Sequence, residues 1–157
     1  HSVCVWSIIE EEIKMLSEKR EHMDKLPGVK LPEDMEFTTD LGITVKGKDV
    51  VVLAVPSPFI RSTSHNLKDL ISEGQIIVNV AKGIEEATLM TMSEVISDEV
   101  PQAKVTVLSG PSHAEEVGKA MPTTVAVASD NIKLAEEVPI VPAKDAFFAI
   151  KISVCHS

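Results

Sequence analysis

Short apolar runs, rich in β-branched residues, alternate along the chain with longer segments in which apolar positions recur at helical spacing. The predicted strands lie at residues 3–6, 36–38, 49–55, 75–80, 104–108 and 123–128. The predicted helices lie at residues 10–20, 57–72, 89–100, 113–119 and 130–138, with a further helical turn led by Asp40. Strands that alternate with helices are typical of a parallel sheet covered on both faces. We therefore predict an α/β fold, Rossmann-like and doubly wound, with a mainly parallel sheet.

Two element boundaries are marked by residues with strong backbone preferences. The unbroken apolar run at residues 49–55 predicts a fully buried strand, and Pro56 ends it because proline cannot donate to a sheet ladder. The turn at residues 109–111 leads into the helix at 113–119, for which Ser112 is the predicted N-cap.

The pattern changes after Val138. Residues 139–157 hold Pro139, Pro142 and an apolar group at 147–150 with no clear period, so we predict an irregular, divergent tail. Residues 1–138 are predicted to fold as a unit. The chain opens with His1-Ser2 and no initiator methionine, and we expect it to be part of something longer.

Composition narrows the class of partner and compartment. The formal net charge is −9, and the basic residues are scattered, whereas a nucleic-acid surface needs them clustered. The apolar runs are far shorter than the roughly 20 residues of a membrane-spanning helix. Cys4 and Cys155 have no metal-type spacing, and no secretory leader precedes them. We predict no nucleic-acid partner, no membrane insertion and a cytoplasmic protein.

Ligands of an open parallel sheet bind outside the carboxyl ends of its strands, so the residues after each apolar run are the candidates. The first group is Pro56 and Ser57. A rigid proline can pack on a flat nucleotide ring, and a helix N-terminus offers free N–H groups to an anion. A simple strand end explains the same residues equally well.

The second group is Lys82 and Gly83, which follow the strand at 75–80. The glycine lets the backbone turn, so Lys82 is predicted to point into the cleft. An ammonium group there can bind a phosphate or polarise a carbonyl, which hydride addition requires. A solvated turn lysine is the simpler alternative.

The third group follows the strand at 104–108 and comprises Gly110, Ser112 and Ala114. Small residues, a hydroxyl and a helix start suit a phosphate or a nicotinamide amide, although an ordinary capped turn has the same composition. His113 precedes the acidic residues Glu115 and Glu116 and has no nucleophile beside it, so we do not assign it a catalytic role.

Several segments taken together resemble the NAD(P)-dependent glycerol-3-phosphate dehydrogenase family of bacterial type. The resemblance runs from about residue 1 to 138, and it rests on the order and spacing of these segments: V-C-V-W at 3–6, L-P-G-V-K-L-P at 26–32, A-V-P-S at 54–57, V-A-K-G-I-E at 80–85 and L-S-G-P-S-H-A-E-E at 108–116. It implies hydride transfer between NAD or NADP and dihydroxyacetone phosphate, giving sn-glycerol 3-phosphate for phospholipid synthesis.

The resemblance also implies roles for individual positions. Lys82, Gly110 and Ser112 match substrate-contacting positions, and the cofactor-contacting set is Pro56, Ser57, Lys82 and Ala114. The position near the adenosine ribose reads Ser7-Ile8-Ile9, without the basic residue often found in NADP-using members, which leaves NAD versus NADP open. Lys25 stands where the family often has an aromatic residue.

Two family features have no counterpart in the residues of this chain. No G-x-G-x-x-G turn occurs, so the first βα unit and its pyrophosphate seat are absent. The family's helical domain supplies the proton-transfer lysine, and neither Lys144 nor Lys151 in the tail can be assigned that role. We therefore predict a partial NAD(P)-binding domain at 1–138 without the helical substrate domain, with no assignable catalytic residue and impaired or no activity.

The main alternative is a non-catalytic Rossmann-like remnant or interaction module. An unpaired sheet edge would favour association between copies of the chain. A related dehydrogenase acting on another small acid shares the fold, but the sequence context of Lys82-Gly83 and of residues 109–111 disfavours it.

Overall fold

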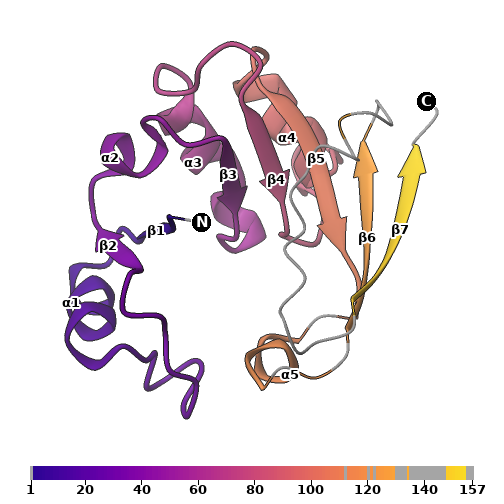
Figure 1. Cartoon of the computed structure of the whole chain (residues 1–157). Helices are drawn as coiled ribbons and strands as arrows, with labels where there is room; N and C mark the ends of the chain where they lie inside the picture. The colour runs from indigo at the N-terminus through magenta and orange to yellow at the C-terminus, as the bar shows by residue number, and fades with distance from the viewer. Residues whose placement is uncertain are drawn as a thin grey trace.

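The computed structural model describes residues 2–111, 113–119, 121, 123–129 and 134, together with the backbone of residues 148–154. Two groups of elements follow one another along the chain (Figure 1). The first group is β1 (Cys4–Trp6), α1 (Glu10–Lys19), β2 (Glu36–Thr38) and α2 (Leu41–Val45). The second group is β3 (Val50–Leu53), η1 (Ser57–Phe59), α3 (Ile60–Leu67), β4 (Ile76–Asn79), α4 (Met92–Glu99), β5 (Lys104–Ser109), α5 (Ala114–Gly118), β6 (Thr123–Ser129) and β7 (Phe148–Val154).

The described strands form two sheets. β1 pairs in parallel with β2, and a five-stranded sheet has the order β3-β4-β5-β6-β7. Every neighbouring pair is parallel except β5 with β6. The predicted α/β architecture with a mainly parallel sheet is therefore confirmed.

The antiparallel pairing of β6 was not predicted, and the described helix in its connection is too short to cross the sheet. β5 has six residues and spans about 20 Å, so a parallel neighbour needs a crossover that returns the chain over that length. The only described helix between the two strands is α5, which has five residues and is about 7.5 Å long. β6 instead runs antiparallel to β5.

Local side-chain chemistry sets the starts of two helices, α2 and α4. In α2, Asp40 caps the first turn by accepting a hydrogen bond from the Ile43 amide at 3.0 Å. In α4, Thr91 and Glu94 form a reciprocal capping box, which satisfies amides that a helix start leaves unpaired. These caps explain why both helices begin where they do.

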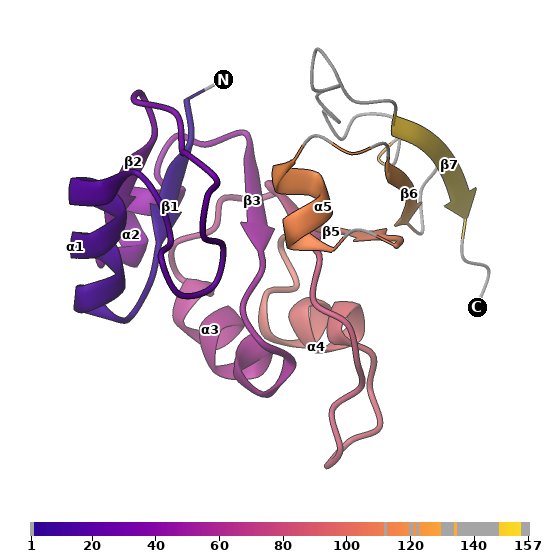
Figure 2. The same cartoon turned by 90° about the horizontal axis from the view of Figure 1, so that it is seen from below.

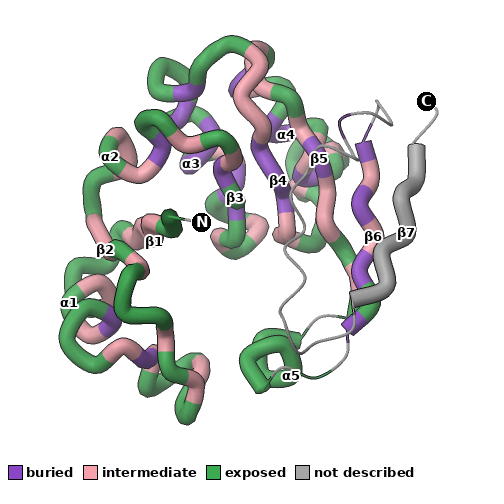
Figure 3. Tube along the Cα trace, in the orientation of Figure 1, coloured by how far each residue is buried: buried purple, intermediate pink, exposed green. Residues whose placement is uncertain are grey.

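The main core lies between β3, β4 and the helices α3 and α4, which Figure 2 shows on one side of the sheet. Ile60, Leu67, Ile77 and Ile96 each have 0% of their surface exposed. Buried positions are concentrated along β4 and the covering helices (Figure 3). Full burial of one such side chain contributes about 1.5–3 kcal/mol, so this layer holds the fold together.

The prediction of a fully buried strand at 49–55 was wrong. Val51 and Leu53 are buried in the core cluster, but Val52 is 57% exposed. Successive side chains of a strand point to opposite faces, and the core cluster covers the sheet at β3 on one face. β3 is also an edge strand of its sheet.

The helix predicted at residues 57–72 is shorter than expected. A 3₁₀ turn over Ser57–Phe59 precedes α3, which ends at Leu67. The chain then continues in turns that bury Ile71. The Gln102 side-chain amide donates to the carbonyls of Lys68 and Ile71, so groups that a continued helix would satisfy find a partner on another segment.

Two further predictions concern the third site group and the tail. The N-cap of α5 is His113, not Ser112, which lies outside the described residues. The irregular tail was a wrong prediction for residues 148–154, because β7 pairs in parallel with β6. Ile150, Ile152 and Val154 recur at every second position with Lys151 and Ser153 between them, which is the alternation of a strand.

The helix predicted at 130–138 lies outside the described residues except for Leu134, which is buried. The division of the chain at residue 138 stays a prediction. Within the described part of the chain, every helix is too short or too polar to cross a membrane.

Candidate site at the carboxyl ends of β3, β4 and β5

The parallel register of three strands brings their carboxyl ends to one edge of the sheet. Leu53 pairs with Asn79, and Asn79 pairs with Val107. The Val80 amide extends this ladder by donating to the Leu53 carbonyl at 3.1 Å. The residues that follow the strands therefore leave the sheet side by side, as the sequence predicted.

The turn after β4 is shaped by Asn79, which sequence reasoning passed over. Its side chain is buried, accepts from the Ala81 amide at 3.0 Å and donates to the Ala81 carbonyl at 3.1 Å. This reciprocal clamp fixes the backbone that leads to Lys82. An asparagine at the end of an apolar strand is the signal that could have revealed it, since such side chains bind nearby backbone.

Lys82 reaches from the end of β4 to the end of β5. Its ammonium group donates to the Gly110 carbonyl at 3.1 Å, and the residue is exposed. Two of the predicted substrate-contacting residues are therefore brought together. The interaction holds a positive charge over the strand ends, where an anionic or carbonyl ligand can exchange for the backbone oxygen.

Gly83 makes a close approach that needs glycine. Its φ is +124°, a backbone conformation that residues other than glycine rarely adopt. A Cβ built on it would lie 3.4 Å from the Ser57 hydroxyl oxygen. The loop after β4 therefore packs directly on the start of η1. The predicted turning role of Gly83 is confirmed, and Ser57 is its neighbour.

Gly110 is closely packed against β6, whereas the sequence suggested that a small residue there suits a bound ligand. A Cβ built on it would lie 2.4 Å from the Thr124 carbonyl oxygen and 3.0 Å from the Val125 Cα. The close approach is to the backbone of β6, so this glycine lets β5 and β6 pass within van der Waals distance of each other.

The remaining predicted residues surround this edge without bonding to Lys82 in the described part of the chain. Pro56 is exposed and precedes η1, and Ser57 is half-buried. Ala114 begins α5 and is exposed, as is the preceding His113. Ser112 lies outside the described residues, so its predicted substrate contact stays a prediction.

The position after β1 is occupied by a polar cluster on Glu12. Its carboxylate accepts from the Ser7 hydroxyl at 2.8 Å and from the Lys25 ammonium group. These two hydrogen bonds lower the pKa of Glu12, and the bond from Lys25 contributes most. Lys25, predicted to stand in place of an aromatic residue, is therefore engaged with a carboxylate on α1.

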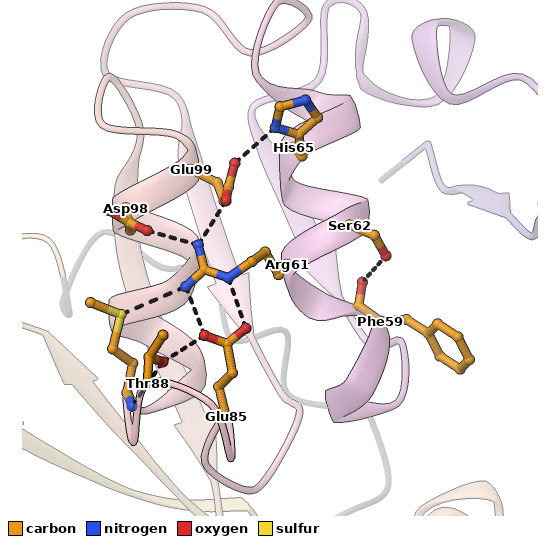
Figure 4. Close-up of polar contacts among 9 residues, drawn as sticks. Phe59, Arg61, Ser62, His65, Glu85, Thr88, Asp98 and Glu99 are labelled. Atoms are coloured by element: carbon orange, nitrogen blue, oxygen red, sulfur yellow. Dashed lines mark hydrogen bonds and ion pairs between the residues drawn. The ribbon is translucent and has the colours of Figure 1, made fainter.

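A second polar cluster, centred on Arg61 of α3, was not predicted. Its guanidinium binds Glu85 in the Lys82 loop, residues 80–91, and two acidic residues of α4, Asp98 and Glu99 (Figure 4). The partners lie 24, 37 and 38 residues away in sequence, so no local spacing could have revealed the cluster. The bonds from Arg61 and Thr88 lower the pKa of Glu85 to about 2.

These carboxylates predict an acid-sensitive fold. The pKa of Glu85 falls from its ordinary value of 4.5 to about 2, and the pKa values of Glu12 and Glu99 are also lowered. A carboxylate with a depressed folded-state pKa stabilises the fold fully above its unfolded value and loses that contribution as pH falls. We expect the urea midpoint to decrease from about pH 5 toward pH 2. The variant Glu85→Gln should show a slightly shallower decrease, because a single partly exposed pair contributes little to global stability, and a steeper decrease would contradict this assignment.

Comparison with known proteins identifies the family to which this strand-end arrangement belongs. The family described as NAD-dependent glycerol-3-phosphate dehydrogenase N-terminus matches residues 1–135. The chain belongs to this family. Its similarity to members of the glycerol-3-phosphate dehydrogenase family extends over nearly the whole part of the chain in which the strands and helices were predicted.

Two relatives and one solved structure show how far the similarity extends. The chain is 59% identical over 138 residues to a glycerol-3-phosphate dehydrogenase [NAD(P)+] of Agathobacter rectalis, covering 88% of this chain and 41% of that protein. It is 51% identical over 136 residues to one of Fusobacterium nucleatum, covering 85% and 41%. The crystal structure of glycerol-3-phosphate dehydrogenase from Coxiella burnetii superposes with a TM-score of 0.87 at 25% identity, covering 97% of this chain and 46% of that one. The chain thus spans less than half the length of these relatives.

Proposed function

We propose that this chain supplies part of the nucleotide and substrate walls of an NAD(P)-dependent glycerol-3-phosphate dehydrogenase. The reaction is hydride transfer between NADH or NADPH and dihydroxyacetone phosphate, giving sn-glycerol 3-phosphate for phospholipid synthesis in the cytoplasm. The proposal is supported by family membership and by the strand-end geometry. The observation that carries it is the Lys82 ammonium group, held 3.1 Å from the Gly110 carbonyl across two strand ends.

The proposed roles follow from the chemistry of each position. Lys82 binds the phosphate or polarises the carbonyl of dihydroxyacetone phosphate, because a compact ammonium group can do either. Gly110 and Ser112 complete the substrate wall. Pro56, Ser57 and Ala114 line the nucleotide side, and the closeness of Gly83 to Ser57 supports a position of that side next to the Lys82 loop.

We further propose that the chain alone has impaired or no activity. Its residues include no G-x-G-x-x-G turn to seat a pyrophosphate, and no proton-transfer lysine is assignable. Hydride transfer needs the nucleotide and the substrate to be held at near-attack distance. The proposed walls contact each of these two reactants on one side only. Binding of nucleotide or substrate is therefore the property to measure.

Replacing Lys82 with methionine is expected to weaken binding of dihydroxyacetone phosphate at least about tenfold, because a charged hydrogen bond is lost while the length of the side chain is kept. Isothermal titration calorimetry at fixed ionic strength measures the effect. Lys104→Met is the matched control, because Lys104 is an exposed lysine at the opposite, amino end of β5. Equal binding by Lys82→Met and wild type would overturn the proposed role.

A second candidate function, a non-catalytic interaction module, is favoured by the free sheet edges. β1 has no described strand partner besides β2, and β3 has none besides β4, so backbone groups on both edges lack a described ladder partner. Such edges template strand pairing, and association between copies of the chain is the expected outcome. Size-exclusion chromatography with a nicotinamide nucleotide titration separates the candidates. A nucleotide-binding monomer supports the dehydrogenase wall, and an oligomer that ignores nucleotide supports the module.

A further inference from the structure

We infer that Arg61 and Glu85 form a positioning pair that holds the Lys82 loop over the strand ends. The inference rests on the proposed function, because it assigns these residues a role through Lys82. Neither residue touches the proposed ligand site. Their effect passes through the backbone between Glu85 and Lys82, three residues earlier in the chain.

The contact between the two residues has the geometry of a forked pair. The Arg61 Nε donates to the Glu85 Oε1 at 2.7 Å, and its Nη2 donates to the Oε2 at 2.8 Å (Figure 4). Two parallel charge-assisted hydrogen bonds fix direction as well as distance. Thr88 adds a third bond to the same carboxylate at 2.6 Å, so the Glu85 side chain has little rotational freedom.

Arg61 is itself anchored on its other side. Its Nη1 donates to Asp98 and to Glu99 of α4, both at 2.7 Å, and Glu99 also bonds to His65 of α3. Residues of α3 and α4 therefore hold the guanidinium plane in place, and Glu85 is bound to a fixed point. Nε and Nη2 of the guanidinium bind the loop through Glu85, and Nη1 binds α4.

The backbone carries this constraint toward Lys82. The Glu85 amide donates to the Met90 carbonyl, and the Leu89 amide donates back to the Glu85 carbonyl, both at 2.8 Å. Ile84 and Thr91 form a bridge at the base of the same loop. On the other side of Lys82, the Asn79 clamp fixes Ala81. The lysine therefore stands between two anchored points.

Burial holds the two ends of this loop but not its middle. Ala81 and Met90 pack against the core cluster, whereas Ile84 is 57% exposed and Leu89 is 73% exposed, so the apolar side chains between the ends contribute little to packing. Hydrogen bonds remain as the main constraint. The Arg61 and Glu85 side chains are 31% and 20% exposed, and partly exposed pairs contribute little to global stability. The pair should therefore affect the loop far more than it affects unfolding.

The ammonium group gains from this arrangement because lysine is flexible. Its four-carbon side chain loses conformational entropy when a ligand binds, and a fixed backbone at Lys82 reduces that loss. Freeing the loop should weaken ligand binding even though the charge of Lys82 is unchanged.

The test compares Glu85→Gln with Asp98→Asn in the full chain. Each change replaces one carboxylate on Arg61 with an amide of the same shape, but only the first acts on the loop. We expect Glu85→Gln to speed hydrogen exchange of the Glu85 and Leu89 amides about tenfold and to weaken dihydroxyacetone phosphate binding several-fold. Asp98→Asn should leave both quantities near wild-type values, because Glu99 still anchors the same Nη1 of Arg61.

Two outcomes would overturn the inference. Unchanged exchange in Glu85→Gln would show that the pair does not hold the loop, and equal effects of both variants would show a general structural role. The exchange measurement needs no ligand, so it decides the question even if the wild-type chain fails to bind. Absence of wild-type binding would count against the proposed function, while loop exchange would still separate the two variants.

Discussion

Replacing Gly110 with alanine is expected to destabilise the chain by about 2–3 kcal/mol, near the upper end for inserting a methyl group into a packed site. The added Cβ would lie 2.4 Å from the Thr124 carbonyl oxygen and 3.0 Å from the Val125 Cα. Both are backbone atoms of β6, so no side-chain rotation relieves the overlap. β5 and β6 must separate, and the register that joins Leu108 to Val127 is lost or strained.

Urea denaturation at neutral pH measures this loss, with Gly47→Ala as the control. Gly47 has φ +67° and nothing within 4 Å of its built Cβ, so alanine there adds backbone strain without overlap. A cost of about 1 kcal/mol is expected for the control. If Gly110→Ala lowers the free energy of unfolding no more than Gly47→Ala does, β5 and β6 do not approach closely at Gly110. The same variant should weaken phosphate-ligand binding, because the carbonyl that meets Lys82 moves with the strand end.

Replacing Leu67 with alanine is expected to cost about 3 kcal/mol, because Leu67 has 0% of its surface exposed. The residue ends α3 and belongs to the cluster that joins α3 and α4 to β3 and β4. Truncation removes buried methyl groups and leaves a cavity that packed neighbours fill only in part. A loss of this size is a large share of the stability of a small domain.

Leu70→Ala provides the matched control, because Leu70 is the same residue type three positions later and is 40% exposed. We expect its cost to stay below about 1 kcal/mol. Thermal unfolding followed by circular dichroism compares the two. Similar melting temperatures for both variants would contradict the placement of the core between the helices and β3–β4.

The sequence predicted the elements well where one local signal sufficed. The run at residues 104–108 and the Asp40-led turn correspond to β5 and α2, because an apolar β-branched run and an N-cap each act over a few residues. Gly83 was also recognised correctly, since a glycine after a buried strand indicates a turn. The fold class followed from alternation alone.

The failures arose where distant segments decide the outcome. Val52 belongs to an apolar run, yet its exposure depends on which face α3 and α4 cover. Arg61 looked like an ordinary helix residue because its partners come from elsewhere in the chain. Gly110 was predicted to suit a ligand because it is small, but its close neighbour, the backbone of β6, could be known only from the pairing of β5 with β6.

The separation of the two sheets has a consequence for how the chain unfolds. No ladder hydrogen bond joins β1 to β3 among the described residues, so β1, α1 and β2 can open without breaking the larger sheet, while Val45 of α2 is buried in the larger core cluster. Cooperative units of folding follow such boundaries. Trp6, the chain's one tryptophan, lies in β1 and bonds to the Thr39 carbonyl. Its fluorescence therefore reports on the smaller unit alone, whereas the helical circular dichroism sums α1 of the smaller unit with α3 and α4 of the larger one.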